Sequence, residues 1–330
     1  MRGDDSDVNR RTFLARVGLA AASASLIAPL RDVSGQTLVP NSSGTASPKL
    51  QAPANACDCH HHIYDVVRFP LPAGSSNPVV SQARVEEYQL LRMRLHTTRS
   101  IIVTPAPYVT DNRVTLDAIA RFRGAARGVA VVRPEVTDAE LRALDRAGIR
   151  GIRFSLNQSA ATPNPVTTLD MVEPLSKRIA SLGWHVQINL EPENIAAAEA
   201  LWNRLPAPIV FDHIARIPGR EGTRHPAYPV VRRLLDKGRT WVKLSVSSVG
   251  GISEDGPPTY ADLGRLGQEF VKAAPERLVW GSNWPHPGQD AKPDDAILFD
   301  MMTRWAPDDR TRRRILVDNP AVLYGFDRPL

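Results

Sequence analysis

Short β-rich runs alternate with amphipathic segments along most of this chain, and this alternation constrains the fold more than any other feature. The β-rich runs are nearly continuous in apolar residues. We expect strands at 56–63, 99–104, 127–132, 149–154, 184–190, 208–213, 240–246 and 278–283. We expect helices at 84–95, 138–147, 193–204, 259–273, 294–305 and 308–317. Strands of this kind, each followed by a helix, predict a parallel sheet covered by helices.

Eight strand–helix units favour a closed (β/α)8 TIM barrel, a single α/β domain, over an open doubly wound sheet. No Gly-x-Gly-x-x-Gly turn follows the first strand, which further weakens a dinucleotide-binding alternative. We place the barrel at residues 56–328. In such a barrel alternate side chains of each strand point inward, and active sites lie at the C-terminal ends of the strands.

The N-terminus predicts an export signal rather than part of the barrel. Arg10 and Arg11 precede a weakly apolar, alanine-rich run from Val17 to about Leu30, which is typical of a twin-arginine signal peptide. An amphipathic first helix is the alternative. The run is too short to span a bilayer, so we expect no membrane insertion. We therefore assign residues 1–35 to the signal, residues 36–55 to a disordered linker rich in polar residues, and the protein to the periplasm.

Charge and cysteine content exclude some classes of protein. Lys and Arg number 41 against 35 Asp and Glu, which predicts attraction for anions. The excess is too diffuse for a nucleic-acid surface, so we expect no nucleic-acid partner. Only Cys57 and Cys59 are present, too few for a disulfide framework, and we interpret them as small buried apolar residues. A homo-oligomer is compatible with the sequence.

The first strand carries the densest group of chemically active residues, in "ACDCHHHIYD" at 56–65. Strand alternation predicts that Asp58, His60 and His62 share one face. Cys57, Cys59 and His61 then share the other. His60 and His62 would lie at the end where barrel active sites are built, and His61 would pack outward.

Polar residues recur at the ends of the other strands. They are Arg153 on the fourth strand, His185, Gln187 and Asn189 on the fifth, Asp212 and His213 on the sixth, Lys243, Ser245 and Ser247 on the seventh, and Asn283 on the eighth with His286 just beyond. Each residue alone has an ordinary structural explanation. Because all these ends meet at one rim of a barrel, we interpret them together as one site.

The motifs "DCHHHIYD", "FDHIAR" and "VWGSNWPHP" resemble the amidohydrolase superfamily. The branch most similar to this chain holds 2-pyrone-4,6-dicarboxylate lactonase, 4-sulfomuconolactone hydrolase and D-galactarolactone isomerase. The resemblance covers about residues 55–328. It implies a barrel enzyme that acts on a lactone, with His60, His62 and His213 around the carbonyl oxygen.

The chain departs from this pattern at informative positions. Hydrolytic members usually carry aspartate where this chain has Asn283. Arg153 matches an arginine that binds a substrate carboxylate, but no second arginine follows in "SLNQSAATP" or "KLSVSSVGG", and Ala106 stands where a serine is expected. These departures argue against the pyrone dicarboxylate and leave another small anionic lactone as the expected substrate. Tyr108, Gln187 and Ser245 complete the expected substrate-binding set with Arg153.

Whether the site needs a metal stays open at this point. His60, His62 and His213, with a fourth histidine on strand five, could bind Zn²⁺ through imidazole nitrogens. Asparagine cannot supply the carboxylate that completes many zinc sites. Some members of this branch work without metal, and imidazoles would then donate to the carbonyl oxygen.

Three hypotheses for function follow. A lactone hydrolase, which we rank first on the resemblance, would need a base for water other than Asn283; His286, Asp212 or a metal-bound hydroxide are the candidates. A lactone isomerase needs no base for water, because the substrate's own hydroxyl attacks the carbonyl. A missing general base costs roughly 10²–10⁴ in rate, which favours this alternative. The third hypothesis is a non-catalytic periplasmic barrel that binds a ligand.

Overall fold

The computed structural model describes residues 38–73, 75, 82–156, 166–246 and 253–327. The segment expected to be a twin-arginine signal lies outside these residues, as does Ser247. Within them, no helix has both the length and the apolar character needed to cross a bilayer.

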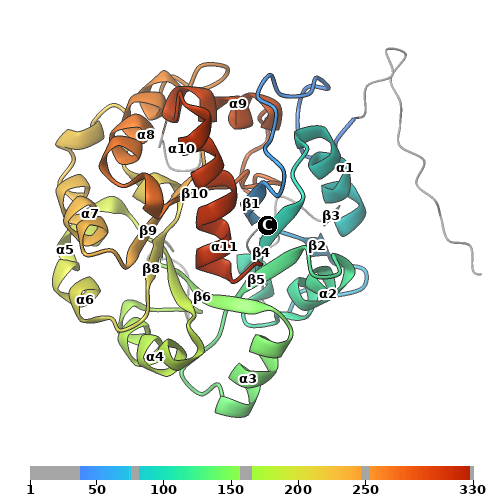
Figure 1. Ribbon diagram of the computed structural model, residues 1–330. Helices are drawn as coiled ribbons and strands as arrows, with labels where there is room; N and C mark the ends of the chain where they lie inside the picture. The colour runs from blue at the N-terminus through green and yellow to red at the C-terminus, as the bar shows by residue number, and fades with distance from the viewer. Residues whose placement is uncertain (1–37, 74, 76–81, 157–165, 247–252, 328–330) are drawn as a thin grey trace, which may run out of the picture. The chain divides into compact units, whose positions relative to one another are not determined.

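Eight parallel strands form one sheet in chain order (Figure 1). They are β1 (Cys57–His61), β4 (Arg99–Val103), β5 (Ala126–Ala130), β6 (Ile149–Ser155), β7 (His185–Asn189), β8 (Ile209–Phe211), β9 (Thr240–Leu244) and β10 (Leu278–Trp280). The first and last strands meet through the backbone: Asn283 N donates to His60 O at 2.8 Å, and His62 N donates to Trp284 O at 2.9 Å. The expected (β/α)8 barrel is confirmed.

Helices surround the sheet on its outer side (Figure 1). They are α1 (Val85–Leu95), α2 (Arg113–Arg121), α3 (Asp138–Arg146), α4 (Val172–Ile179), α5 (Pro192–Ala197), α6 (Glu199–Arg204), α7 (Ala227–Asp236), α8 (Ala261–Ala273), α9 (Asp295–Trp305), α10 (Asp309–Arg313) and α11 (Asn319–Tyr324). Short helical turns are η1 (Ala106–Tyr108), η2 (Leu169–Met171), η3 (Ala180–Leu182), η4 (His213–Arg216), η5 (Gly222–Arg224), η6 (Pro275–Arg277) and η7 (Arg314–Asp318). A two-stranded antiparallel sheet, β2 (Tyr64–Asp65) with β3 (Gln82–Ala83), follows β1.

Side-chain caps explain where several of these helices begin. The Thr137 hydroxyl accepts a hydrogen bond from Glu140 N, while the Glu140 carboxylate accepts one from Thr137 N, so α3 begins with a capping box. Asp294 accepts from Ala296 N at the start of α9. The helix expected at 193–204 is divided in two because Ala198 leaves helical geometry.

The N-terminal end of the barrel is filled by apolar side chains and covered by α11. The inner cluster contains Cys57, Cys59, Ile101, Val103, Val129, Val210, Trp241 and Val279 from the strand segments, with Ala321, Leu323, Tyr324 and Phe326 from the C-terminal segment. In Figure 1, α11 (red) lies across the middle of the barrel. Both cysteines are free and buried, as expected. The opposite end of the barrel is left for a site.

The disordered linker expected at 36–55 is wrong for residues 38–55, which pack against the barrel. Val39 is buried. Trp284 Nε1 donates to Pro40 O at 2.8 Å, and Leu50 N donates to Asp300 Oδ1 at 2.8 Å. A polar composition predicts disorder only where no partners exist, and the barrel supplies those partners here.

Candidate active site

A register shift in β1 decides which of its side chains face the barrel interior. Asp58 and His61 lie three positions apart, yet they pair with β4 residues that are two positions apart. The extra residue interrupts the inward–outward alternation of side chains along β1. Two consecutive residues, Cys59 and His60, therefore both face inward. The expectation that Asp58 shares a face with His60 and His62 is therefore wrong.

Asp58 instead joins β1 to β10 and α1 from outside the site. Its carboxylate accepts hydrogen bonds from Ser282 Oγ (2.6 Å), Ser282 N (2.9 Å), Tyr88 Oη (2.9 Å) and His60 N (3.1 Å). Burial raises the pKa of Asp58 to about 6, although these hydrogen bonds lower it. His61 packs outward as expected, stacked on Tyr88 with ring centroids 3.5 Å apart. These outer contacts hold the strand that presents His60.

His60 and His62 form a hydrogen-bonded pair at the mouth of the barrel. His62 Nδ1 lies 2.8 Å from Val103 O, and the Nε2 atoms of the two rings lie 3.3 Å apart. A carbonyl oxygen can only accept, so His62 carries its proton on Nδ1 and its Nε2 accepts. His60 then donates from Nε2. Its Nδ1 lies between two charged groups, 3.4 Å from Lys243 Nζ and 3.2 Å from Asp212 Oδ1; with the proton on Nε2, this nitrogen accepts from the ammonium.

Lys243 and Asp212 form the buried charged centre beneath these histidines. Lys243 Nζ donates to Gln187 Oε1 at 2.7 Å and lies 3.5 Å from Asp212 Oδ1. Asp212 Oδ2 accepts from Gln187 Nε2 (3.0 Å) and Arg153 Nε (3.2 Å). Both Asp212 and Lys243 are fully buried. Because donors and cations surround Asp212, its carboxylate is a weak base in this site.

The ionisation states in the site follow from burial and charge. Burial alone would raise the pKa of Asp212, but His60, Lys243 and Arg153 hold that pKa well below its usual range. Burial lowers the pKa of Lys243, and Asp212 opposes this. The carboxylate of Asp212 balances only one of the two cations, Lys243 and Arg153. The mouth of the barrel therefore carries net positive charge, which favours an anionic ligand.

Burial disfavours the protonated form of all three histidines of the site. Burial lowers the pKa of His60 well below its usual range, although Asp212 opposes this. Burial also lowers the pKa of His62 and His213 to about 3. Each neutral ring offers one donor and one acceptor, a set suited to polarising a carbonyl and transferring a proton.

A left-handed turn places His213 next to Asp212. His213, Ile214, Ala215 and Arg216 all have φ between 51° and 55°. This conformation costs non-glycine residues roughly 1–2 kcal/mol each, so neighbouring contacts must hold it. His213 Nδ1 lies 2.8 Å from Ser245 Oγ. Arg216 Nη2 donates to Glu191 Oε1 at 2.8 Å.

Arg153 provides an anion-binding group beside the histidines. It is 6% exposed. Its Nε is bonded to Asp212, and within the described ranges its terminal nitrogens have no hydrogen-bond partner. The pKa of Tyr64 is raised by burial and lowered by Arg153, so the phenol lies near the guanidinium. The Tyr64 ring also lies 6.5 Å from that of His62.

Asn283 enters the site at the end of β10. Its φ is 66°, a region that asparagine tolerates better than most residues. Its backbone N–H is bonded to His60 O, and its side chain makes no hydrogen bond to another residue in the part of the chain described. Two positions before it, Gly281 allows close approach, because a Cβ there would lie 2.6 Å from His60 Cβ.

Three predicted residues lie apart from the cluster. His286 Nε2 lies 3.1 Å from Asp295 Oδ1 of α9, and the Tyr108 hydroxyl accepts from Asp65 N at 3.2 Å. His185, considered as a fourth metal ligand, lies lower in the barrel with its ring 5.4 Å from that of Tyr324. Contacts bring together most of the other predicted residues; they are His60, His62, His213, Arg153, Gln187 and Ser245. Asn283 joins this group through its backbone N–H, which donates to His60 O.

The atoms close enough to hold a metal ion differ from the expected set. His60, Asp212 and His213 each place one ligand atom within 4.8 Å of the others; Asp212 takes the place expected for His62. Asp212 Oδ1 accepts no hydrogen bond from a described residue, which would suit a metal. The positive charge of the neighbouring Lys243 ammonium disfavours metal binding at this oxygen.

Two distances give the electrostatic repulsion between Lys243 and a divalent ion bound to Asp212. An ion bonded to Asp212 Oδ1 at about 2.1 Å would lie within about 5.6 Å of Lys243 Nζ, which is 3.5 Å from the same oxygen. Repulsion between the two cations would then be at least about 6 kcal/mol at an effective dielectric constant of about 20. The Lys243 ammonium therefore competes with a divalent ion for the charge position beside Asp212.

Sequence reasoning placed Lys243 among the polar strand residues of the site but assigned it no role, and it did not single out Tyr64. The period of two that Lys243 shares with Ser245 in "TWVKLSV" indicates that the ammonium is turned inward, but not which groups it contacts. Tyr64 follows the histidines but lies on the separate strand β2, so strand alternation could not place it.

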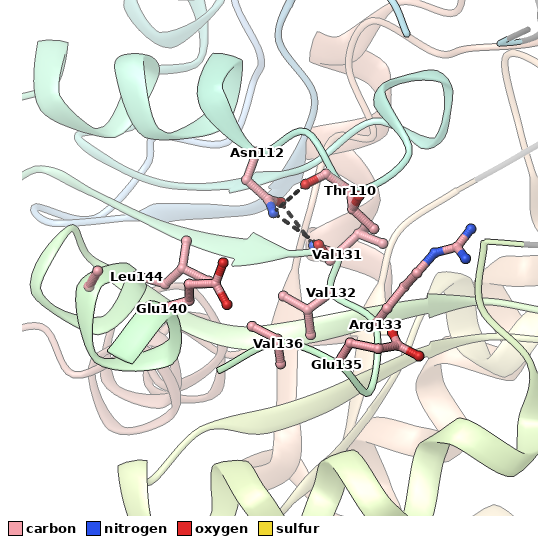
Figure 2. Close-up of a pocket in the computed structure, with 10 residues that line it drawn as sticks. Thr110, Asn112, Val131, Val132, Arg133, Glu135, Val136, Glu140 and Leu144 are labelled. Carbon is pink, nitrogen blue, oxygen red and sulfur yellow. Dashed lines mark hydrogen bonds between the residues drawn. The ribbon is translucent and has the colours of Figure 1, made fainter. Parts of the chain in front are cut away.

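A separate hollow of about 490 Å³ lies where β5 ends, beside α3 (Figure 2). Its lining includes Val131, Val132, Val136, Arg133 and Leu144. The hollow contains none of the residues predicted for the site.

Comparisons with known proteins agree with this geometry. The profile of the amidohydrolase family matches residues 57–326. A 2-pyrone-4,6-dicarboxylate hydrolase of Comamonas testosteroni is 31% identical over 287 residues, covering 84% of this chain and 93% of that protein. A 4-sulfomuconolactone hydrolase of Rhizobium radiobacter is 32% identical over 277 residues, covering 83% and 91%.

Two further similarities concern an isomerase and a solved structure. A D-galactarolactone isomerase of Agrobacterium fabrum is 29% identical over 292 residues, covering 87% of this chain and 96% of that protein. A crystal structure from Agrobacterium tumefaciens matches with a TM-score of 0.76 at 28% identity, covering 86% of this chain and 100% of the other. The resemblance drawn from the strand motifs is confirmed.

Proposed function

Because this chain belongs to the amidohydrolase family, within a branch of lactone hydrolases and a lactone isomerase, we propose that it hydrolyses the ring ester of a small anionic lactone. Two of the three relatives named above are hydrolases. The observation that supports an anionic lactone best is Arg153, whose terminal nitrogens have no partner among the described residues beside three neutral imidazoles.

The histidine pair supplies a donor and an acceptor for this reaction. Without substrate, His60 Nε2–H donates to His62 Nε2. A lactone carbonyl oxygen takes over this donor when it binds, and charge developing on that oxygen strengthens the hydrogen bond. His62 Nε2 is then free to take a proton from attacking water and to pass it to the leaving ring oxygen. In this proposal the reaction runs without a resident Zn²⁺, because Lys243 already supplies a cation.

A panel of matched lactones tests the proposal. Carboxylate-bearing and neutral lactones of the same ring size are compared for kcat/KM with wild type, Arg153→Met and the control Arg133→Met at the outer hollow. Losing a charge-assisted hydrogen bond costs about 1.5–3 kcal/mol, so Arg153→Met should lower the preference for the anionic lactone roughly 10–100-fold. Equal losses on both lactones would contradict the role of Arg153. Tight ligand binding without turnover of any lactone would instead indicate a binding barrel.

Isomerisation is the second candidate, and Asn283 is the observation that favours it. Asn283 carries no charge, Asp212 is surrounded by cations, and His62 is a weak base because its pKa is about 3. A substrate hydroxyl held beside the carbonyl reacts with an effective molarity of up to roughly 10⁵–10⁸ M, so it needs less activation than water. Isotope incorporation from labelled water separates the two reactions, since only hydrolysis adds a solvent oxygen.

A further inference from the structure

Lys243 is a buried cation that neither reaction uses to touch substrate. It belongs to β9, whose other inward residue Trp241 lies in the apolar inner cluster. Its side chain is fully buried beneath the histidines, and the one hydrogen bond that it donates to an oxygen of the described residues goes to Gln187. Burying an ammonium is costly unless the fold provides a counter-charge. The position of this group therefore calls for an explanation.

The neighbours of Lys243 supply that explanation. Its Nζ lies 3.4 Å from His60 Nδ1 and 3.5 Å from Asp212 Oδ1. His60 and Asp212 belong, with His213, to the group of residues close enough to hold a metal ion. The ammonium therefore contacts two of the three side chains that a divalent ion would use.

We propose that the Lys243 ammonium is the resident cation of this site, taking the charge position that a divalent metal would otherwise fill between His60 and Asp212. It acts as a positioning residue. Asp212 Oδ1 lies 3.2 Å from His60 Nδ1 and would draw the His60 proton to that nitrogen. By donating to Nδ1 and pairing with Asp212, the ammonium keeps the proton on Nε2, directed toward the substrate, and through Gln187 it fixes the carboxylate. The catalytic part of this proposal rests on the proposed lactone chemistry, whereas the electrostatic part does not.

A direct consequence is that removing the ammonium should create a metal site. In Lys243→Met the side-chain length is nearly kept and the charge is lost. His60, Asp212 and His213 then face a neutral group, and two nitrogens with one carboxylate oxygen form a ligand set that suits a divalent transition ion.

Co²⁺ titration of metal-stripped protein tests this consequence without any substrate. Wild type, Lys243→Met, Lys243→Met/Asp212→Asn and the surface control Lys237→Met are followed by visible absorption and calorimetry. Lys243→Met should bind one Co²⁺ at least about 100-fold more tightly than wild type, with the absorption bands of a four- or five-coordinate ion. The double variant should lose this binding, and Lys237→Met should behave as wild type.

Tight binding of one Co²⁺ by wild type, lost in Asp212→Asn, would overturn the proposal. Failure of folded Lys243→Met to gain Co²⁺ would overturn it equally. Lys243→Gln, which keeps an N–H donor for Gln187, replaces Lys243→Met if the latter does not fold. Wild type and Asp212→Asn titrated side by side keep the proposal testable even if no Lys243 variant folds: tight Co²⁺ binding that depends on Asp212 contradicts a resident ammonium, and its absence supports one.

Kinetics test the positioning role separately. With any lactone that wild type turns over, metal-free Lys243→Met should lose about 100-fold in kcat with KM changed less than about threefold, because the residue does not reach substrate. An equal rise in KM would contradict this role. If wild type turns over no lactone, the proposed function fails while the Co²⁺ result still stands.

Discussion

We propose that Asn283 takes the position at which the resemblance to hydrolytic amidohydrolases implies a carboxylate base. Its left-handed backbone conformation is tolerated by both asparagine and aspartate, so Asn283→Asp changes charge with little backbone cost. If His62 already serves hydrolysis, the variant should change the hydrolytic kcat less than about tenfold. A general base added where none existed raises the rate roughly 10²–10⁴-fold. A gain of that size, with loss of ring migration, measured by NMR of the products, would instead identify wild type as an isomerase.

The position of a residue in the site was predictable where it depends only on the strand that carries the residue. His60, His62, His213 and Arg153 follow strand runs or end them, and barrel geometry brings strand ends together. The role of Lys243 was not predictable, because its partners His60, Gln187 and Asp212 come from three other strand segments and only their register sets the distances. Asp58 was placed on the wrong face because a register shift leaves no clear signature in "CDCHHH".

At the scale of elements, the turn η4 is the most strained segment of the site. Ala215 is buried within it and has a φ of 53°. Ala215→Gly removes a conformational cost of about 1–2 kcal/mol and loses one buried methyl, worth about 0.8 kcal/mol, so stability should change little. Ala215→Val adds branching and volume and should cost about 3 kcal/mol or more.

Thermal unfolding compares the two variants of this turn. Ala215→Gly should melt within a few degrees of wild type, and Ala215→Val should melt clearly below it. The valine variant should also lose activity, because the same turn holds His213 against Ser245. Equal melting temperatures for both variants would show that the turn relaxes freely and is not held by its surroundings.

The order and type of the elements were predictable because apolar periodicity is a local property of each segment. All eight expected strands are present. The break at Ala198 between α5 and α6 and the packing of residues 38–55 were not predictable, because both depend on contacts with the assembled barrel.

At the scale of the whole molecule, buried histidines should make the fold sensitive to acid. Burial lowers the pKa of His62, His185 and His213 to about 3. Below about pH 6.5 the unfolded chain binds protons at these residues and the folded chain does not, so stability falls as pH falls. Burial also lowers the pKa of His60 and His61 well below the usual range. Asp58, with its pKa raised to about 6, opposes this between pH 6 and 4, but as one group against five.

Urea unfolding at several pH values measures this effect. The free energy of unfolding should fall by at least about 3–4 kcal/mol between pH 6.5 and pH 5, the amount expected from His62, His185 and His213 less the opposing effect of Asp58. Asp58→Asn should steepen the loss, because it removes the opposing group. A free energy that stays constant or rises over this interval would mean that these histidines are protonated in the folded state.

The central claim is that the histidine cluster directs water at the carbonyl of an anionic lactone. Metal-stripped protein is therefore incubated with an anionic lactone that it turns over, in water enriched in ¹⁸O, and early products are analysed by NMR and mass spectrometry. The account predicts an opened hydroxy acid that carries one solvent oxygen in its new carboxylate, with no migrated lactone at early times. A migrated lactone without ¹⁸O, formed before any hydroxy acid, would contradict it.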